Sequence, residues 1–479
     1  MSLALHPTSR SFKSNASAAL KNDTLQKAMG YLGFVGKRAE AVSRLPEFEQ
    51  LRDQARDIKN HTLAHLDFYL ETYEERVRKS GGQVHWCRTP EEARQTILGI
   101  CRSVEARTIT KGKTMVAEEI ALNPFLEANG VAPIETDLGE YIIQLRDEPP
   151  SHIIAPAIHV TKEQVADTFL EKHGIYGKTK LLTEPREMLE EARGILREKF
   201  IRADVGLTGA NFLIAETGSS IIVTNEGNGD LTQLLPRIHI VLATPEKLVP
   251  NLEDVSTILR LLARSATGQE FSVYTTVSTG PKRPEDIDGP EQYHVVILDN
   301  GRTAMLGTEF QDMLRCIRCS ACMNHCPVYG AVGGHAYGWV YPGPMGAVLT
   351  PSLIGVDQAG ALPNASTFCG KCESVCPMKI PLPKMMRHWR EREFDRKLSA
   401  PVARAGLAAW SFVARRPTLY RSLTGIAAKL LGFLGRRHGN LVNLPLASGW
   451  TEFRDFPAPE GRTFHQAWAA RASRRHGGV

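Results

Sequence analysis

Long apolar runs are missing from this sequence of 479 residues. No stretch approaches the ~18 consecutive apolar residues that a membrane-spanning helix requires. The first residues also lack a basic segment followed by an apolar one, so we expect no secretory signal. These absences predict a cytoplasmic protein whose cysteines stay reduced and are not paired in disulfides.

Nucleotide-binding signatures are missing as well. No G-x-G-x-x-G motif follows a predicted strand, and Gly227-Asn228-Gly229 lacks the third glycine of that pattern. No phosphate-binding P-loop is present either. The chain therefore has no recognisable flavin or nicotinamide site, and a two-electron step would need a partner or an unrecognised pocket.

Acidic residues are absent from residues 401–450, although seven basic residues lie there: Arg404, Arg415, Arg416, Arg421, Lys429, Arg436 and Arg437. The charge of this segment, +7, exceeds the +6 of the whole chain, so the basic character is local. Apolar stretches at 408–413 and 430–434 interrupt the basic residues. Two interpretations stay open, namely peripheral contact with the inner membrane face or a partner, and a solvated helical tail. Nucleic acid is not expected, because no binding motif accompanies the charge.

Seven of the nine cysteines stand in two short runs. The first run reads Cys316-Ile317-Arg318-Cys319-Ser320-Ala321-Cys322-Met323-Asn324-His325-Cys326-Pro327 and matches C-x2-C-x2-C-x3-C-P, a bacterial ferredoxin spacing. In that arrangement three closely spaced thiolates hold one iron–sulfur cluster, and the cysteine before the proline reaches the other cluster. The spacing therefore predicts an electron carrier with two clusters.

The second run, Cys369-Gly370-Lys371-Cys372-Glu373-Ser374-Val375-Cys376-Pro377, lacks one ligand. When Cys376 is aligned with Cys326, the position of Cys316 is taken by Ser366. Crossed ligation assigns to the first cluster Cys316, Cys319, Cys322 and Cys376, and to the second cluster Cys326, Cys369 and Cys372. The first would be [4Fe-4S]. The second would be [3Fe-4S], or [4Fe-4S] with Ser366, a water or a partner's side chain as its fourth ligand.

Other uses of the cysteines fit less well. A structural zinc site uses two separated pairs of ligands, which does not suit a third cysteine two residues on. Cys87 and Cys101 stand apart from the runs in apolar surroundings, and we expect them to be buried structural thiols.

The chain divides into four parts: a helical region at 1–70, alternating strand and helix signals at 71–300, the cysteine region at 305–385, and the basic region at 386–479. The alternation predicts an α/β domain with a mostly parallel sheet. A long helix is expected over Phe48–Lys79, and Thr89 with Pro90 should open another. Further helices are expected at about 162–173, 184–203, 252–265 and 384–397, and strands at 83–87, 142–145, 212–215, 220–223, 239–242, 271–274 and 294–298.

A stretch rich in glycine and proline, from Gly333 to Gly346, separates the two cysteine runs. Its simplest role is a compact loop that covers the clusters. Alternatively, His335 or Tyr337 guides electrons or a ligand.

Together these motifs resemble the LutB family of lactate-utilisation iron–sulfur proteins. The resemblance covers nearly the whole chain and rests on the cysteine runs, on Gly338-Trp339-Val340-Tyr341-Pro342-Gly343-Pro344, and on residues 113–119, 135–141, 216–218 and 224–228. It implies a LUD domain similar to the CoA-transferase and ribose-isomerase fold, an α-helical two-cluster ferredoxin-like domain, and a helical C-terminal tail. It also implies that the seven-cysteine pattern is the family's own, and that two partner proteins take part in oxidising L-lactate to pyruvate.

Candidate residues also lie in the LUD-like region. Residues 224–230 follow a predicted strand, where open α/β sheets usually bind ligands. Glu226 is a candidate base or nucleophile, and Lys111 and Lys113 are candidates for holding a carboxylate. The competing interpretation is a hydrogen-bonded turn with solvated lysines. Glu118, Glu119 and 135–137 are ambiguous in the same way, since acids near helix starts often serve as caps.

The leading hypothesis is a non-flavin iron–sulfur subunit of an L-lactate dehydrogenase complex that passes electrons to an unidentified acceptor. One alternative is electron transfer from another 2-hydroxy acid of the glycolate type, because no sequence motif indicates which substrate is oxidised. The other is a regulatory or binding protein whose clusters are structural or sense oxygen. Two clusters with crossed ligands lie close together, which favours electron relay.

Overall fold

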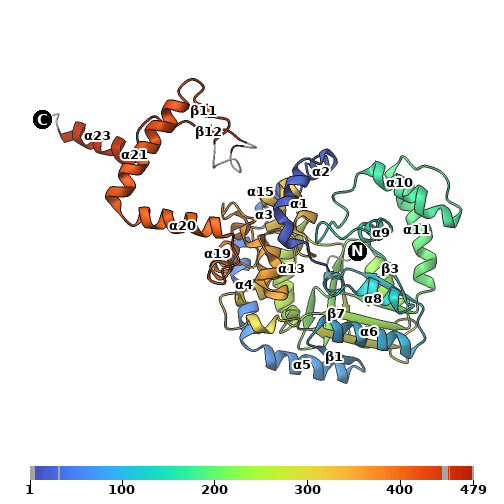
Figure 1. The fold of residues 1–479 in the computed structure, drawn as a ribbon. Helices are drawn as coiled ribbons and strands as arrows, with labels where there is room; N and C mark the ends of the chain where they lie inside the picture. The colour runs from blue at the N-terminus through green and yellow to red at the C-terminus, as the bar shows by residue number, and fades with distance from the viewer. Residues whose placement is uncertain (1–5, 31–32, 445–450, 452–453, 477–479) are drawn as a thin grey trace. The chain divides into compact units, whose positions relative to one another are not determined.

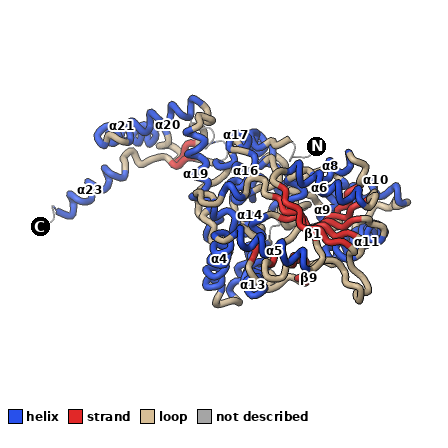
Figure 2. The backbone as a smooth tube through the Cα atoms, turned by 90° about the horizontal axis from the view of Figure 1, so that it is seen from below, coloured by secondary structure: helices blue, strands red, loops and turns tan. Residues whose placement is uncertain are grey.

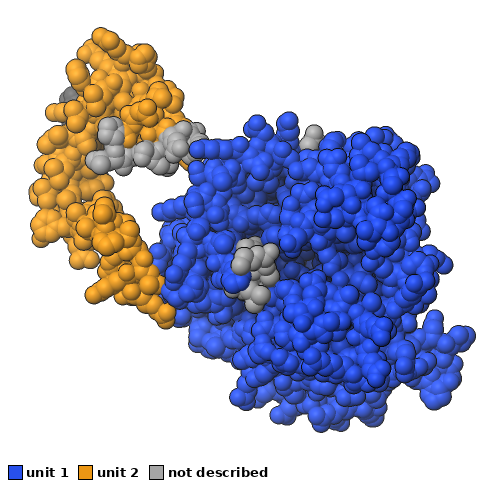
Figure 3. Space-filling model, turned by 45° about the vertical axis from the view of Figure 1, so that its right-hand side comes forward, with its two compact units in different colours: residues 1–393 blue, residues 394–479 orange. Residues whose placement is uncertain are grey.

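The computed structural model describes residues 6–30, 33–444, 451 and 454–476, with side chains up to residue 471. These residues fall into two compact units, 1–393 and 394–479, coloured separately in Figure 3. Residues 401–450 therefore belong to the second unit, and all seven clustered cysteines belong to the first.

A six-stranded, fully parallel sheet forms the centre of the first unit (Figures 1 and 2). Its strand order is β1-β10-β7-β4-β2-β3. The bounds are β1 Gln83–Cys87, β10 Gln292–Leu298, β7 Ile238–Ala243, β4 Val205–Thr208, β2 Thr108–Gly112 and β3 Ala132–Glu135. The register pairs His294 with both Gln83 and Ile240. The α/β prediction with a mostly parallel sheet is confirmed.

Both faces of this sheet are covered, as a parallel sheet requires. One face packs against α6 (Pro90–Ser103) and α8 (Leu122–Ala128), with Cys87 and Cys101 buried in that core. The other face packs against α5 (Leu66–Lys79) and a smaller sheet in the order β8-β5-β6-β9. That sheet comprises β8 Leu248–Val249, β5 Phe212–Ile214, β6 Ser219–Thr224 and β9 Tyr274–Ser278.

Several local predictions are confirmed. Thr89 caps α6 by accepting the Glu92 N–H at 3.2 Å, with Pro90 in the first turn. The expected helices correspond to α10 Lys162–Lys172, α11 Pro185–Ile201, α13 Leu252–Ala266 and α19 Leu382–Asp395. The remaining helices around the sheet are α7 Met115–Glu119, α9 Leu138–Leu145 and α12 Asn228–Leu234, with 3-10 turns at η2 His173–Tyr176 and η3 Pro245–Lys247.

Three expectations were wrong. The strand expected at 142–145 lies in helix α9, which Asp137 caps by accepting the Gly139 N–H at 3.1 Å. The strand expected at 271–274 begins only at Tyr274. The single helix expected over Phe48–Lys79 is broken at His65, whose φ of −125° and ψ of 36° lie outside the helical region.

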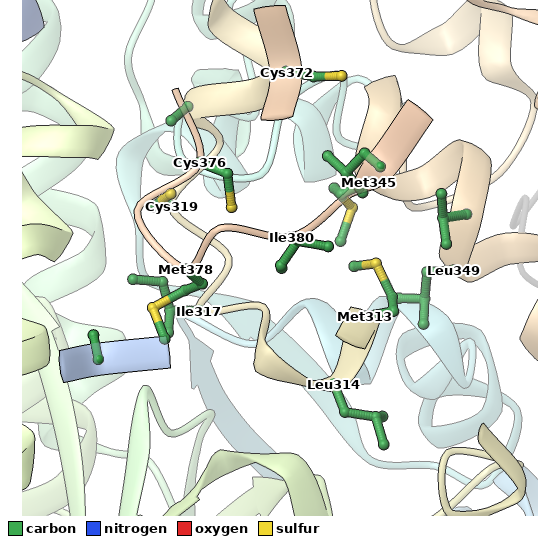
Figure 4. Packing of buried hydrophobic residues seen from close by; sticks show 14 of the residues in the cluster. Met313, Leu314, Ile317, Cys319, Met345, Leu349, Cys372, Cys376, Met378 and Ile380 are labelled. Atoms are coloured by element: carbon green, nitrogen blue, oxygen red, sulfur yellow. The ribbon is translucent and has the colours of Figure 1, made fainter. Parts of the chain in front are cut away.

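The helices that precede the sheet pack on the cysteine region. They are η1 Ser9–Ser11, α1 Phe12–Leu20, α2 Asp23–Met29, α3 Phe34–Ser43 and α4 Phe48–Ala64. The cysteine region contains η4 Thr303–Met305, η5 Gln311–Arg315, α14 Ala321–Asn324, α15 Pro327–Val332, η6 His335–Tyr337, α16 Gly343–Ile354, α17 Val356–Ala359, η7 Leu362–Asn364 and α18 Lys371–Ser374. One apolar core joins α4, α13 and this region (Figure 4).

The second unit contains α20 Pro401–Ala414, α21 Pro417–Leu434 and α23 Phe464–His476. Strand β11, Asn440–Leu441, pairs antiparallel with β12, Phe456–Pro457. In the described part of the chain, no helix combines the length and apolarity needed to cross a membrane.

A buried ion network ties the sheet to the cysteine region. Arg302, in the loop after β10, donates to both carboxylate oxygens of Glu119 at 2.6 and 2.9 Å and to Glu246 at 3.3 Å. Tyr341, from the stretch between the cysteine runs, donates to Glu119 at 2.6 Å. Burial alone would raise the pKa of Glu246, but Arg302 and Arg318 outweigh it and hold that pKa at about 2.

Removing the central guanidinium should cost stability. We expect Arg302→Gln to lower the free energy of unfolding by about 3–5 kcal/mol, because two buried carboxylates lose their partner. Arg237→Gln is the matched control, since its pair with Glu291 at 2.9 Å is exposed and should contribute at most about 1 kcal/mol. Urea unfolding of the anaerobic proteins measures both changes. Equal, small losses would contradict the structural role of the network.

Candidate functional site

The two cysteine runs fold as copies of one another. Cys319 is flanked by Arg318 and Ser320, whose φ angles of 59° and 60° are left-handed. Phe368 and Gly370 flank Cys369 in the same way, with φ of 54° and 77°. The short helices α14 and α18 start two residues after Cys319 and Cys369, respectively. The two runs therefore share the same local backbone conformation. In this correspondence, Ser366 occupies the position of Cys316.

Four thiols from both runs line one cavity. They belong to Cys316, Cys319, Cys322 and Cys376, and the rest of the lining is mostly apolar, including Met345, Met378 and Ile380. Figure 4 shows Cys319 and Cys376 approaching each other from different runs. We call these four cysteines the inner set.

The other three cysteines of the runs interact among themselves and form the outer set. The thiol of Cys372 interacts electrostatically with Cys326 and Cys369, and that of Cys326 with Cys369. Cys372 is buried and Cys369 is exposed. Cys322 of the inner set also interacts with Cys372, so the two sets are adjacent. The outer set therefore lies beside the inner set and reaches the surface at Cys369.

Most thiols of the two runs are buried, and burial raises their pKa values. Burial raises the pKa of Cys372 to about 12 and that of Cys376 to about 11. Burial, followed by the neighbouring thiols, also raises the pKa values of Cys319 and Cys322. Such thiols keep their protons unless a cationic centre displaces them, as metal binding does. In contrast, hydrogen bonds from the Lys371 N–H and the Thr367 hydroxyl lower the pKa of exposed Cys369.

Backbone N–H groups point at several of the sulfurs. Ala321 donates to Cys319, Ile380 and Met378 donate to Cys376, and Tyr329 and Val328 donate to Cys326. Hydrogen bonds to sulfur are one of the means by which proteins tune iron–sulfur clusters. Among the described residues, no three His, Cys, Asp or Glu side chains converge closely enough for one metal ion. The inner set instead surrounds a cavity, and its sulfur donors fit a cluster.

Three buried or half-buried cations lie near the inner set. Arg52 donates to the Cys376 carbonyl at 2.7 and 3.0 Å and to that of Ser374 at 3.0 Å. Arg38 donates to the Val375 carbonyl at 3.0 Å and interacts electrostatically with Cys319 and Cys376. Lys59 donates to the carbonyls of Glu246 and Leu248, and burial lowers its pKa to about 8. These cations offset the negative charge that thiolate ligation brings into the core.

Residues between the runs occupy different places. Tyr337 is fully buried and interacts electrostatically with Cys326, Cys322 and Cys372. His335 is held away from them, with its ring nitrogen 2.8 Å from the Pro149 carbonyl. The Ser366 hydroxyl accepts the Phe368 N–H at 3.1 Å.

A second cavity, of about 650 Å³, adjoins the inner set. It lies at the carboxyl ends of β2, β3, β4 and β7, the usual ligand-binding edge of an open α/β sheet, and the end of β6 from the smaller sheet also lines it. Its lining includes Arg318, Cys319 and Tyr341 from the cysteine region. We call it the sheet-edge cavity. One cysteine, Cys319, lines both cavities.

The structure separates the candidates of the LUD-like region into two groups. Lys113 and Glu226 both line the sheet-edge cavity, 3.2 Å apart, and Lys113 also pairs with Asp137. Lys113 has a φ of 59°, an uncommon conformation for a residue with a side chain. Lys111 is instead buried behind the cavity, paired with Glu118 at 2.6 Å and Glu135 at 2.7 Å.

Four residues that line the cavity were not predicted as site residues from the sequence: Glu140, Thr244, Lys247 and Arg318. Burial, Glu135 and Asp137 raise the pKa of Glu140 well above its usual value. Thr244 and Lys247 follow β7, and their position at the sheet edge became apparent only from the strand order.

The cations near the inner set should raise the reduction potential of a bound cluster. We expect Arg38→Gln to lower the midpoint potential on the order of tens of mV, because a nearby positive charge is lost. Arg44→Gln is the matched control on the same segment, since Arg44 is exposed and pairs with Glu40 and Glu270. Potentiometric titration followed by EPR measures both. An unchanged or higher potential in Arg38→Gln would contradict the charge-offset role.

Comparison with known proteins agrees with this geometry. Three family models match consecutive parts of the chain: "LUD domain" at 70–298, "4Fe-4S dicluster domain" at 312–380, and "Lactate utilisation protein B, C-terminal" at 383–473. The second match supports iron–sulfur clusters held by these cysteines. One solved structure, of a duf162 family protein from Deinococcus radiodurans, is 15% identical in sequence. The match covers 49% of this chain and 98% of that protein, and its TM-score of 0.28 is too low to establish a shared fold.

Curated relatives match along almost their whole length. "Lactate utilization protein B" of Geobacillus kaustophilus is 44% identical over 458 residues, covering 94% of this chain and 95% of the relative. The proteins of the same name from Bacillus licheniformis and Geobacillus thermodenitrificans are 42% and 45% identical, covering 96% and 93% of this chain and 97% and 94% of their own. On sequence identity, coverage and domain order, the chain belongs to the lactate utilization protein B family.

Proposed function

We propose that this chain is the iron–sulfur electron-transfer subunit of a complex that oxidises L-lactate to pyruvate. Relatives covering almost the whole chain are named for lactate utilization. The observation that carries the proposal is the arrangement of cysteines: the inner set borders the sheet-edge cavity, and the outer set includes exposed Cys369. In this arrangement, electrons could enter the inner set from the sheet-edge cavity and leave through the outer set at the protein surface.

The two sets would hold two clusters. Cys316, Cys319, Cys322 and Cys376 would hold a [4Fe-4S] cluster, and Cys326, Cys369 and Cys372 would hold a [3Fe-4S] or [4Fe-4S] cluster. For the latter, Ser366, water or a partner's side chain would supply the fourth ligand. The shared cavity of the inner set and the mutual interactions of the outer thiols support this crossed assignment. Bound clusters would supply one-electron transfer.

The protein's own residues would control the environment of that transfer. Met345, Met378 and Ile380 keep water away from the inner set. Arg38, Arg52 and Lys59 offset negative charge there. The exposed Cys369 marks the side from which a redox partner can approach.

Two further proteins would complete the complex. This chain has no flavin or nicotinamide fingerprint, so a partner would have to divide the two electrons of lactate into single steps. The basic tail, with its seven arginines and lysines between apolar stretches, would contact a partner or the inner membrane face, where lipids are anionic. The downstream electron acceptor stays unidentified.

Crossed ligation has a specific consequence. We expect Cys376→Ser to damage the cluster of the inner set and to leave the EPR signal of the outer set largely intact, although Cys376 stands in the second run. Cys87→Ser is the control, because Cys87 is buried in a separate core. Loss confined to the signal that depends on Cys369 and Cys372 would show that the ligands do not cross.

The proposed role predicts a substrate-specific growth defect. A deletion strain that lacks other lactate dehydrogenases should fail to grow, or grow slowly, on L-lactate and should grow normally on pyruvate. The wild-type gene should restore growth, and Cys319→Ser should not, because a chain without its inner cluster cannot relay electrons. Growth on lactate in the deletion strain, or full rescue by Cys319→Ser, would refute the electron-transfer role.

A further inference from the structure

One corner of the sheet-edge cavity contains a lysine that forms no salt bridge with a described residue, although the Glu246 carboxylate attracts it at longer range. Lys247 lies in η3, directly after β7, and only 9% of it is exposed. Its ammonium group forms no hydrogen bond or salt bridge with any residue that the structure describes. Since a buried charge is costly unless it is paired, the corner is electrostatically incomplete.

Two further polar groups in the same corner are unsatisfied. Arg318 donates through Nη2 to Glu246 at 3.3 Å, but its buried Nη1 has no partner among the described residues. The Oγ1 of Thr244, a residue that is 1% exposed, is likewise buried and unpaired there. All three residues line the sheet-edge cavity. Three donors without acceptors thus surround one region of the cavity.

The nearby carboxylates of the protein leave these three donor groups without an acceptor. The Oε1 atom of Glu246 already accepts from both Arg302 and Arg318 at 3.3 Å, and its Oε2 has no donor. Glu119 is already occupied by Arg302 and by the Tyr341 hydroxyl. At the other side of the cavity, Lys113 pairs with both Asp137 and Glu226, so no positive charge is in excess there. The excess of positive charge is therefore concentrated at Lys247 and Arg318.

Offsetting the cysteines is not a sufficient role for Lys247. Lys59 also interacts electrostatically with Cys316, and burial likewise lowers its pKa to about 8. Yet Lys59 donates to two backbone carbonyls and does not line the sheet-edge cavity. Lys247 lacks such acceptors and faces open space. The comparison distinguishes a cation that serves the inner set from one that is available to a ligand.

The remaining wall suits the carbon part of a small organic molecule. Apolar side chains of Leu242, Leu262, Ala263 and Ala266 line the cavity together with the cationic corner. A cavity of about 650 Å³ falls in the range of small-molecule sites. The required ligand is therefore an anion that carries a short apolar portion.

We propose that Lys247, Arg318 and Thr244 bind the carboxylate of a small organic acid in the sheet-edge cavity, next to Cys319. The identification of this acid as a 2-hydroxy or 2-oxo acid rests on the proposed function. Lys247 and Arg318 supply charge-assisted hydrogen bonds, and Thr244 donates a third. A bound carboxylate adds negative charge beside the inner set, so binding and reduction oppose one another reciprocally.

The test uses the full chain, purified anaerobically and loaded with iron and sulfide. Isothermal titration calorimetry with L-lactate and with pyruvate, at constant ionic strength, measures the dissociation constants. We expect at least one acid to bind saturably, and uncharged lactamide to bind at least about tenfold more weakly, because it cannot form the charge-assisted bonds. Binding should also shift the midpoint potential of the inner cluster to lower values.

Three variants locate the site. Lys247→Gln should weaken binding by about tenfold or more, the usual effect of losing a charged hydrogen bond. Thr244→Val, which leaves every charge in place, should weaken it by about fivefold. Lys282→Gln is the control, because Lys282 pairs with Glu291 at 3.7 Å and does not line the sheet-edge cavity, and it should change the dissociation constant by less than about twofold. If Lys247→Gln does not load iron, Thr244→Val and the lactamide comparison still decide the outcome.

Other outcomes would overturn the inference. These are no saturable binding of either acid at millimolar concentration, equal binding of lactate and lactamide, or unchanged binding in both Lys247→Gln and Thr244→Val. If phosphate binds with the same dissociation constant as the organic acids, the corner is a general anion site and the proposed preference for organic acids is wrong. If lactate reduces the clusters in the presence of the partners but no acid binds to this chain, the site is refuted and the proposed function survives.

Discussion

Burying sulfur donors from two distant runs in one apolar cavity is the constraint on which the rest of this structure depends. Thiolates in such a place need positive charge, either from a bound metal cluster or from the protein. The chain supplies Arg38 from α3 and both Arg52 and Lys59 from α4, and all three lie in the first unit with the cysteines. The first helices are therefore part of the cluster environment, and the cysteine region does not form a core of its own.

The second organising feature is the carboxyl edge of the parallel sheet. Loops after successive strands converge there, and the cysteine region closes the same edge with Arg318, Cys319 and Tyr341. The Arg302 network, which joins Glu119, Glu246 and Tyr341, holds the two together. A ligand at the sheet edge would thus lie close to the inner cysteines. This proximity would connect the LUD domain physically to the proposed electron transfer.

The sequence predicted what depends on local spacing. The cysteine pattern, the α6 cap at Thr89 and the parallel sheet could all be predicted, because each follows from short-range chemistry or from alternation. The prediction of a strand at 142–145 was wrong because the apolar run there is equally compatible with the helix that Asp137 caps. Strands β2, β3 and β4 were missed because their residues weaken the strand pattern. Strand β3 contains Pro133 and β4 contains Gly206, and β2 carries Lys111, whose charge is buried in pairs that the sequence does not reveal. Lys247 and Thr244 were missed because their importance arises only when β7 lies beside β4 in the sheet.

The most direct test of the central claim is the metal content of the chain. After anaerobic reconstitution, iron and zinc should be counted by elemental analysis together with acid-labile sulfide. The account predicts roughly seven to eight irons per chain, one four-iron cluster and one three- or four-iron cluster, with matching sulfide. About one zinc per chain and little iron, or only four irons that survive loss of the outer cysteines, would contradict it.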